Sequence, residues 1–226
     1  MTPVIVVGVV IFILVVAWSV VFSQKLKQKR VAAGEQLADS LGATFSAEYH
    51  APPDLGLDAF ESMTLGTYPQ MRNLIRGDVE GIGFDIFDFS ARIRLKIKHQ
   101  SGYRELFLNH TVVALRIPDL ALGRFRVHHK NVQDVARAMA ESQDIEVPSD
   151  LEFDRQFIVR GDQPDSVRQI LNEEVRAAIQ QHPKRFVEVD GDQVLVYQQQ
   201  KSEPIENWLS LRDSALQVGL ELMKAA

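Results

Sequence analysis

The sequence predicts an α+β protein that combines an N-terminal transmembrane helix with a cytoplasmic domain built from an antiparallel sheet and flanking helices. Three observations support this prediction. Residues 4–22 form an uncharged apolar run, residues 91–100 alternate between apolar and polar side chains, and Asp190-Gly191 separates two further alternating segments. These patterns are typical of a membrane helix, a half-buried strand and a β-hairpin, respectively.

The apolar run VIVVGVVIFILVVAWSVVF would be roughly 30 Å long as a helix, which matches the hydrocarbon core of a bilayer. Four cations follow it and are candidates for contact with the membrane surface: Lys25, Lys27, Lys29 and Arg30. Because basic residues favour the cytoplasmic side, we expect residues 1–3 outside the cell, 4–22 in a lipid bilayer and the remainder in the cytoplasm. A cleaved signal peptide fits less well, since no basic segment precedes the run and no small-residue cleavage site closes it.

Composition narrows the function of the remaining chain. After Arg30 the chain has 21 basic and 30 acidic residues, a net charge of −9. This sign disfavours a nucleic-acid partner, because phosphate backbones are bound by basic surfaces. The chain has no cysteine, which excludes disulfides, thiolate metal ligands and cysteine nucleophiles.

A helical stalk is expected over residues 23–43. Ala33, Leu37 and Leu41 recur at helical spacing, and Gly42 stands where a glycine commonly ends a helix. Residues 44–226 then form one cytoplasmic α+β domain. Its first part, up to residue 71, is punctuated by proline and glycine and predicts irregular structure with one short helix at 58–63.

Strand patterns dominate the middle of the chain. Residues 74–90 predict two short strands about a turn at 77–81, and the alternating segment 91–100 leads through a hairpin at Gly102 into a strand at 105–117. A short strand at 124–129 precedes a helix at 132–141.

The last third predicts a strand at 153–159, a helix opened by Pro164, a helix capped by Asn172, and the Asp190-Gly191 hairpin. A final helix at 204–224 has these apolar residues on one face: Ile205, Trp208, Leu209, Leu216, Leu220 and Met223. Phe125-x-Val127 and Phe157-x-Val159 each precede a helix, so two strand-helix units arise either by duplication or by chance.

One strand face is a candidate contact site for an anion or a partner. It has four cations: Arg92, Arg94, Lys96 and Lys98. These could bind phosphate, lipid headgroups or an acidic protein. The alternative is an ordinary solvated sheet face whose cations pair with acids such as Glu105 on the neighbouring strand.

No motif indicates catalysis, so we expect a non-enzymatic protein with no catalytic residue, cofactor or metal. The glycines at 77, 81 and 83 precede a strand and not a helix, unlike a dinucleotide fingerprint. The six histidines form no metal-binding frame, and Asp85 and Asp88 face opposite sides of a strand. A site assembled from residues far apart in sequence, such as Asp85, His110 and Arg160, remains an alternative.

The chain resembles a bacterial family of uncharacterised single-pass membrane proteins. The resemblance rests on the helix end at Leu41-Gly42, the segment RNLIRGDVEGIGFDIFDF, the break at Ile117-Pro118 and FDRQFIV. It implies location in the bacterial plasma (inner) membrane and no particular activity. Phe89 stands where the family often has tyrosine.

These observations together predict a membrane-tethered, non-enzymatic interaction domain, an adaptor or accessory protein that binds an unknown protein through the basic strand face and the last helix. The alternative is a domain that binds anionic lipid or a phosphorylated ligand at the membrane surface. The process, the partner and the oligomeric state are not specified by the sequence.

Overall fold

The computed structural model describes residues 3–96, 102–130, 144–147 and 149–226, and their side chains apart from those of 3–11, 13, 95, 96 and 104. It is an α+β fold around one antiparallel sheet, with strand order β1-β2-β3-β4-β8-β7-β5-β6. The strands are β1 (Thr44–Ser46), β2 (Thr67–Val79), β3 (Ile82–Lys96), β4 (Tyr103–Arg116), β5 (Leu122–His129), β6 (Phe157–Gly161), β7 (Phe186–Gly191) and β8 (Gln193–Tyr197). The helices are α1 (Pro3–Ser40), α2 (Glu61–Thr64), α3 (Leu151–Gln156), α4 (Pro164–Ile170), α5 (Glu173–Gln180) and α6 (Trp208–Ala225), with 3-10 turns η1 (Pro52–Leu55) and η2 (Ile205–Asn207).

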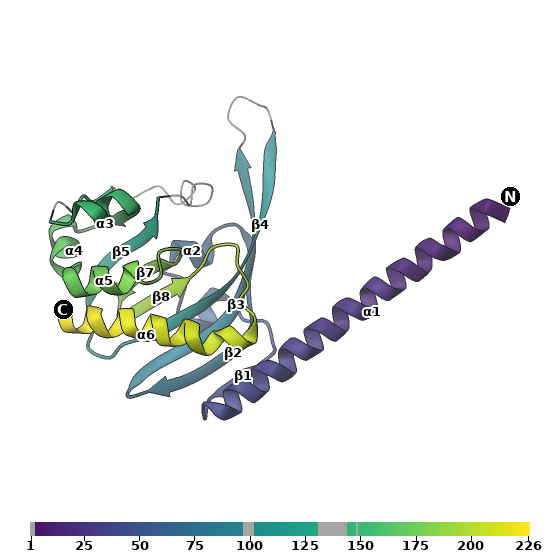
Figure 1. Cartoon of the computed structure of the whole chain (residues 1–226), viewed down its shortest axis with the longest axis horizontal. Helices are drawn as coiled ribbons and strands as arrows, with labels where there is room; N and C mark the ends of the chain where they lie inside the picture. The colour runs from purple at the N-terminus through teal and green to yellow at the C-terminus, as the bar shows by residue number, and fades with distance from the viewer. Residues whose placement is uncertain (1–2, 97–101, 131–143, 148) are drawn as a thin grey trace.

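Helix α1 is one continuous helix whose N-terminal part projects away from the sheet (Figure 1). Its C-terminal part packs on the core through Ala38, which is fully buried. Gly34 allows this approach, because a Cβ there would lie 2.5 Å from the ring of Phe45 in β1. As expected, the turn after α1 uses Gly42 in a left-handed conformation, with φ of 62°.

The predicted transmembrane helix at 4–22 is wrong. Across the residues that the structure describes, no helix combines the length and the apolar character that crossing a bilayer requires.

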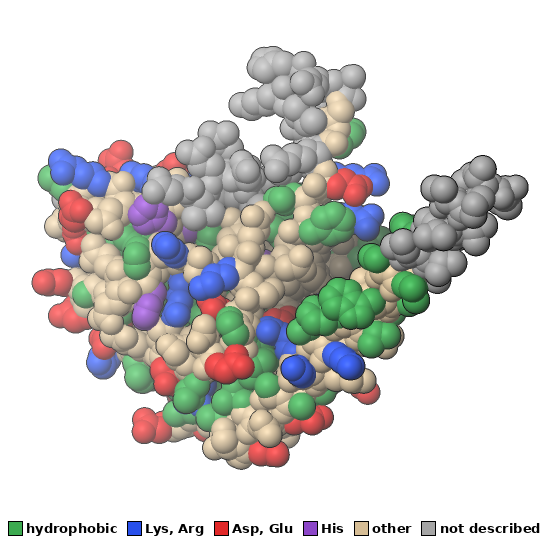
Figure 2. Space-filling view, turned by 45° about the vertical axis from the view of Figure 1, so that its right-hand side comes forward, with side chains coloured by type: hydrophobic (Ala, Val, Ile, Leu, Met, Phe, Trp, Pro, Cys, Tyr) green, Lys and Arg blue, Asp and Glu red, His purple; other side chains and the backbone are tan. Residues whose placement is uncertain are grey.

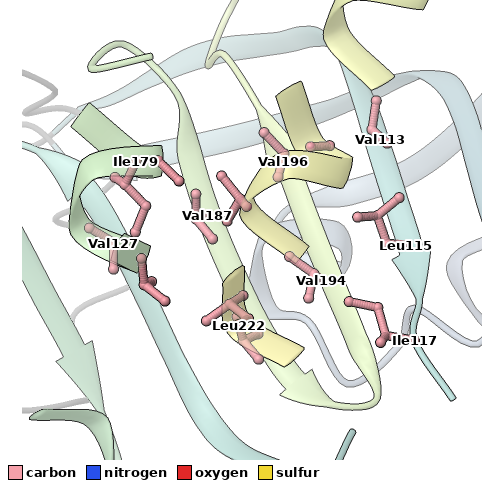
Figure 3. Packing of buried hydrophobic residues seen from close by; sticks show 14 of the residues in the cluster. Val113, Leu115, Ile117, Val127, Ile179, Val187, Val194, Val196 and Leu222 are labelled. Atoms are coloured by element: carbon pink, nitrogen blue, oxygen red, sulfur yellow. The ribbon is translucent and has the colours of Figure 1, made fainter. Parts of the chain in front are cut away.

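One face of the sheet carries the larger core, which is covered by α4, α5 and α6 (Figure 3). Alternate residues of the central strands point into it, among them Val113 and Leu115 of β4 and Val194 of β8. They meet Ile179 from α5 and Leu222 from α6. Because successive side chains of a strand face opposite sides, the intervening residues form a second core on the other face.

The second core lies under the irregular segment that contains η1 and α2. Leu57, Phe60 and Met63 of that segment pack against Phe87 of β3 and Leu195 of β8. The sheet is therefore buried on both faces, which places several polar side chains of the strands away from water.

Several predicted elements differ from the structure. Residues 82–96 form one long strand instead of two, and residues 153–156 belong to α3, since the Asp150 side chain accepts a hydrogen bond from Phe153 N and caps a helix there. The predicted hairpin at Asp190-Gly191 is present, but Asp190 pairs with Gln193, so the turn lies at 191–192. The predicted helix at 132–141 lies outside the described residues.

The apolar face predicted for the last helix is also only partly right. Ile205 and Trp208 are buried as expected, whereas Leu209 and Met223 are 39% and 44% exposed. The buried side of α6 is instead formed by Trp208, Leu211, Ala215, Val218 and Leu222. This face lies on the sheet (Figure 1), so it is not available to a partner.

The strands of the two predicted strand-helix units share one sheet. Strands β5 and β6 pair with each other, Val127 opposite Val159. The helix α4 that follows β6 begins at Pro164 and buries Val167 and Ile170, as predicted. Asn172 caps α5 as predicted, its side chain accepting from Val175 N at 3.0 Å.

Candidate functional site

The projecting part of α1 exposes a row of large apolar side chains. The members are at least 44% exposed: Phe12, Leu14, Val15, Val16, Trp18, Val20, Val21, Phe22 and Leu26. Figure 2 shows hydrophobic side chains along α1 with lysine and arginine side chains at its base. A contiguous apolar surface of this kind marks an interaction site in most proteins, because leaving it in water is unfavourable.

Arg30 joins α1 to the sheet. Its guanidinium donates two hydrogen bonds to Asp88 of β3, at 2.7 and 2.6 Å, and a third to the carbonyl oxygen of Glu203 at 2.8 Å. The Asp88 carboxylate also accepts from Asn73 at 2.7 Å and from Thr111 at 3.1 Å. Arg30, predicted to face the membrane surface, therefore holds the direction of α1 relative to the domain.

A small basic groove lies beside this junction, between α1 and β2. It encloses about 160 Å³ and is lined by Lys27, Arg30, Val31, Ala47, Tyr49, Arg72 and Asn73. A β-bulge between Arg72 and Ile75, with Asn73 at φ 53°, shifts the register of β2 at this point. Bulges re-aim side chains, and this one lies where Arg72 lines the groove. We call this site the basic groove.

Lys25 and Lys29, the other predicted membrane-surface cations, are exposed on α1 and do not line the basic groove. Of the four cations predicted from sequence, Lys27 and Arg30 therefore line the basic groove, and Arg30 also pairs with Asp88. Arg72 was missed because nothing near it in sequence links it to α1.

Two cations of the predicted basic strand face pair with one acid. Arg94 Nε lies 3.2 Å from Glu105 Oε1, and Arg92 lies 3.9 Å from the same carboxylate. The Arg92 guanidinium also lies 5.2 Å from the centre of the Phe107 ring. Lys96 is the last residue of β3, and Lys98 lies outside the described residues.

A larger cleft of about 370 Å³ lies at the other end of the sheet, between α2 and strands β5, β6 and β7. Three arginines line it, and each donates to a carboxylate at 2.5 to 3.3 Å: Arg124 to Asp190, Arg126 to Glu61 and Arg160 to Asp144. The charge of each arginine is neutralised by a carboxylate of the protein itself, so the charge of the cleft does not indicate a class of ligand.

Glu188 lines this cleft from β7 and is almost completely buried. Burial raises the pKa of its carboxyl group, since the charged form loses hydration, and this outweighs the opposing hydrogen bond from Tyr197. Burial and the neighbouring Glu188 together raise the pKa of the Tyr197 hydroxyl as well. Both shifts favour the protonated, uncharged forms of Glu188 and Tyr197 at the second core.

Aromatic and imidazole rings form a stack across five strands of the same face. His128, Phe186, Tyr197, His110 and Phe89 follow one another with centroid separations of 4.9, 5.0, 4.7 and 5.1 Å. Burial lowers the pKa of His110 to about 3, and neither of its ring nitrogens has a hydrogen-bond partner among the described residues. His110 is therefore a neutral packing residue at physiological pH.

The three residues of the alternative enzyme site, Asp85, His110 and Arg160, do not converge in the fold. Burial alone would raise the pKa of Asp85, but hydrogen bonds from Arg76 and Arg116 at 2.7 and 2.8 Å hold it below its usual value. His110 lies in β4, and Arg160 in β6 is separated from β4 by three strands. In the described part of the chain, no three histidine, aspartate or glutamate side chains gather as metal ligands would.

The sequence did not predict that Asp88 and Glu188 would be buried and hydrogen-bonded. Asp88 stands in the apolar segment FDIFDF, and Glu188 in RFVEVD. An acid inside a strongly apolar strand is almost never fully buried without a partner. That signal points to buried pairs at these positions, although it does not identify the partners.

No family model and no curated protein matches the chain, so the resemblance to an uncharacterised bacterial family stays a prediction. Among solved structures, the chain is similar to the crystal structure of the mycobacterial trehalose monomycolate transport factor A, TtfA. The TM-score is 0.58 and the sequence identity 14%, over 85% of this chain and 94% of that chain. At this identity the similarity shows a shared fold.

Proposed function

We propose that this protein is a non-enzymatic accessory protein that works at a lipid surface and presents its α+β domain to a protein partner there. The observation that carries the proposal is the exposed apolar row on α1, a helix whose direction is held by the partly buried Arg30–Asp88 ion pair. The apolar surface supplies attraction to lipid, and the ion pair transmits the orientation to the domain.

Lipid suits this helix better than a single protein partner. Leu14, Val15 and Val16 are consecutive and all exposed, and consecutive helical residues point about 100° apart. A partner protein usually covers one stripe of a helix, whereas a lipid surface can take up apolar side chains over a wider arc. Moving each large side chain out of water is worth about 1.5–3 kcal/mol.

The fold neighbour supports an accessory role. TtfA is described as a transport factor for trehalose monomycolate, and the present chain shares its fold over most of its length. We infer by analogy that this domain assists a transport process, and we place it at the bacterial plasma membrane with the domain on the cytoplasmic side. A reporter fused after Ala226 should be active only in the cytoplasm, and activity on the outer side would contradict this placement.

Vesicle flotation with the full chain tests the lipid contact. Trp18→Gln/Phe22→Gln removes two stacked, exposed aromatic rings of α1 and should lower the floated fraction at least tenfold. Leu151→Gln is the control, because Leu151 is 65% exposed on α3, away from the apolar row. Equal flotation of both variants, or no flotation of the unmodified protein, would contradict the proposal.

The protein partner is tested by purification from native membranes in detergent. A partner in near-stoichiometric amount is expected, and its absence would leave a lipid-binding domain without an adaptor role.

A further inference from the structure

We propose that the basic groove between α1 and β2 binds the phosphate group of an anionic lipid headgroup, with Lys27 and Arg72 as its ligands. This inference rests on the proposed function, because it assigns the headgroup that α1 meets when its apolar row contacts lipid.

Charge is the first argument. The groove is lined by three cations and no acid. Arg30 is satisfied by the Asp88 carboxylate, whereas no ion pair among the described residues involves Lys27 or Arg72. In a chain with net charge −5, two cations left side by side without a carboxylate are a feature that an anion would stabilise.

Geometry is the second argument. Arg72 is only partly exposed and comes from a strand that the β-bulge and the Asn73–Asp88 hydrogen bond hold in place. An arginine guanidinium group can donate two parallel hydrogen bonds to one phosphate, and a lysine adds a positive charge on a flexible side chain. The volume of about 160 Å³ equals roughly five liquid water molecules at about 30 Å³ each, which is room for a phosphate and part of its ester.

Position is the third argument and selects lipid over free phosphate. Lys27 directly follows Leu26, the last exposed residue of the apolar row. When that row contacts acyl chains, the groove lies at the level where headgroups begin. A lipid bound there is held at both ends, so the second contact forms at high effective concentration, whereas a free anion has only the two cations.

The test compares binding of the full chain to vesicles of phosphatidylcholine alone and vesicles with roughly a quarter phosphatidylglycerol, an anionic lipid. The unmodified protein should bind both and prefer the anionic vesicles. In the Lys27→Gln/Arg72→Gln variant, the ratio of affinities for anionic and neutral vesicles should fall about tenfold, while the affinity for neutral vesicles stays the same. The matched control Lys29→Gln/Arg94→Gln removes the same charge outside the groove and should lose less than about threefold, the effect of general attraction.

The outcomes separate the two proposals. If the unmodified protein binds neither vesicle, the proposed function and this inference both fall. If it binds both equally, or if the two double variants lose the same preference, the lipid contact stands and the groove assignment is wrong. Glycerol phosphate at millimolar concentration should not displace the protein from anionic vesicles, and displacement at micromolar concentration would assign the groove to a soluble phosphate ester.

Discussion

The hydroxyl of Tyr197 in β8 donates a hydrogen bond of 2.5 Å to Oε1 of Glu188 in the neighbouring strand β7. Both groups are buried beneath the segment that contains η1 and α2. The contact places an ionisable carboxyl group at the inner wall of the larger cleft, and its protonation is coupled to folding.

Replacing Glu188 should change how stability depends on pH. Its pKa is raised above 4.5 in the folded state, so the folded protein binds this proton more tightly than the unfolded chain does. The contribution is fully present below about pH 4.5 and is lost as pH rises through the folded pKa. Glu188→Gln should therefore gain stability relative to the unmodified protein as pH rises, measured by urea unfolding. The control Glu105→Gln, on an exposed residue, should follow the unmodified curve.

Separating Arg30 from Asp88 should destabilise the domain strongly. Their side chains are 26% and 9% exposed, and Arg30→Gln leaves the buried carboxylate without its cation. Breaking a fully buried pair costs about 3–5 kcal/mol, and breaking this partly buried pair should cost about the lower end of that range, whereas Arg94→Gln, which removes the exposed pair with Glu105, should cost under about 1 kcal/mol. In a double-mutant cycle, adding Asp88→Asn to Arg30→Gln should cost little more, and simple additivity would show that the pair is not coupled.

His110 should make the protein sensitive to acid. Its pKa falls from 6.5 to about 3 on folding, so the stability it contributes is present above pH 6.5 and is lost as pH falls toward 3. The slope from one such group reaches about 1.4 kcal/mol per pH unit. His110→Phe, which preserves ring stacking with Phe89 and Tyr197, should flatten this decline in urea unfolding between pH 6.5 and 4. His50→Phe, at a partly buried histidine whose Nε2 lies 3.2 Å from Ser46 Oγ, is the comparison and should not flatten it.

Gly219→Ala should destabilise α6 although alanine is the better helix former. A Cβ at this position would lie 2.9 Å from Leu115 Cδ1 and 3.0 Å from Ile117 Cδ1, both fully buried in the larger core. Overpacking of this kind costs about 1–3 kcal/mol, which exceeds the gain of about 1 kcal/mol from helix propensity. Gln217→Ala on the same helix should change thermal unfolding little, and a more stable Gly219→Ala protein would show that the sheet yields to the added methyl group.

Local signals in the sequence predicted local structure well. The left-handed Gly42, the Pro164 helix start and the Asn172 cap are all present, because each depends on steric and hydrogen-bonding preferences within a few residues. The hairpin near Asp190 was predicted for the same reason and was displaced by one residue, since strand register is set by the side chains that each face must bury.

Partners across the sheet could not be predicted in this way. Arg30 reaches Asp88, which lies 58 positions along the chain, and Arg72 comes beside Lys27 only because β2 packs against α1. The buried face of α6 likewise follows the shape of the sheet and not the helix's own apolar pattern. Cations that are neighbours in sequence therefore have different environments: Arg30 lies in an ion pair, Lys27 lines the basic groove, and Lys25 and Lys29 are exposed.

The sequence by itself determined the turn at Gly42, the helix start at Pro164 and the helix cap at Asn172, and that the chain has one long apolar segment followed by cations. Only the tertiary structure decided which of those cations are neutralised and which remain beside the apolar helix. The physical reason is range: backbone preferences act within a few residues, whereas the environment of a charge depends on the order in which eight strands pair.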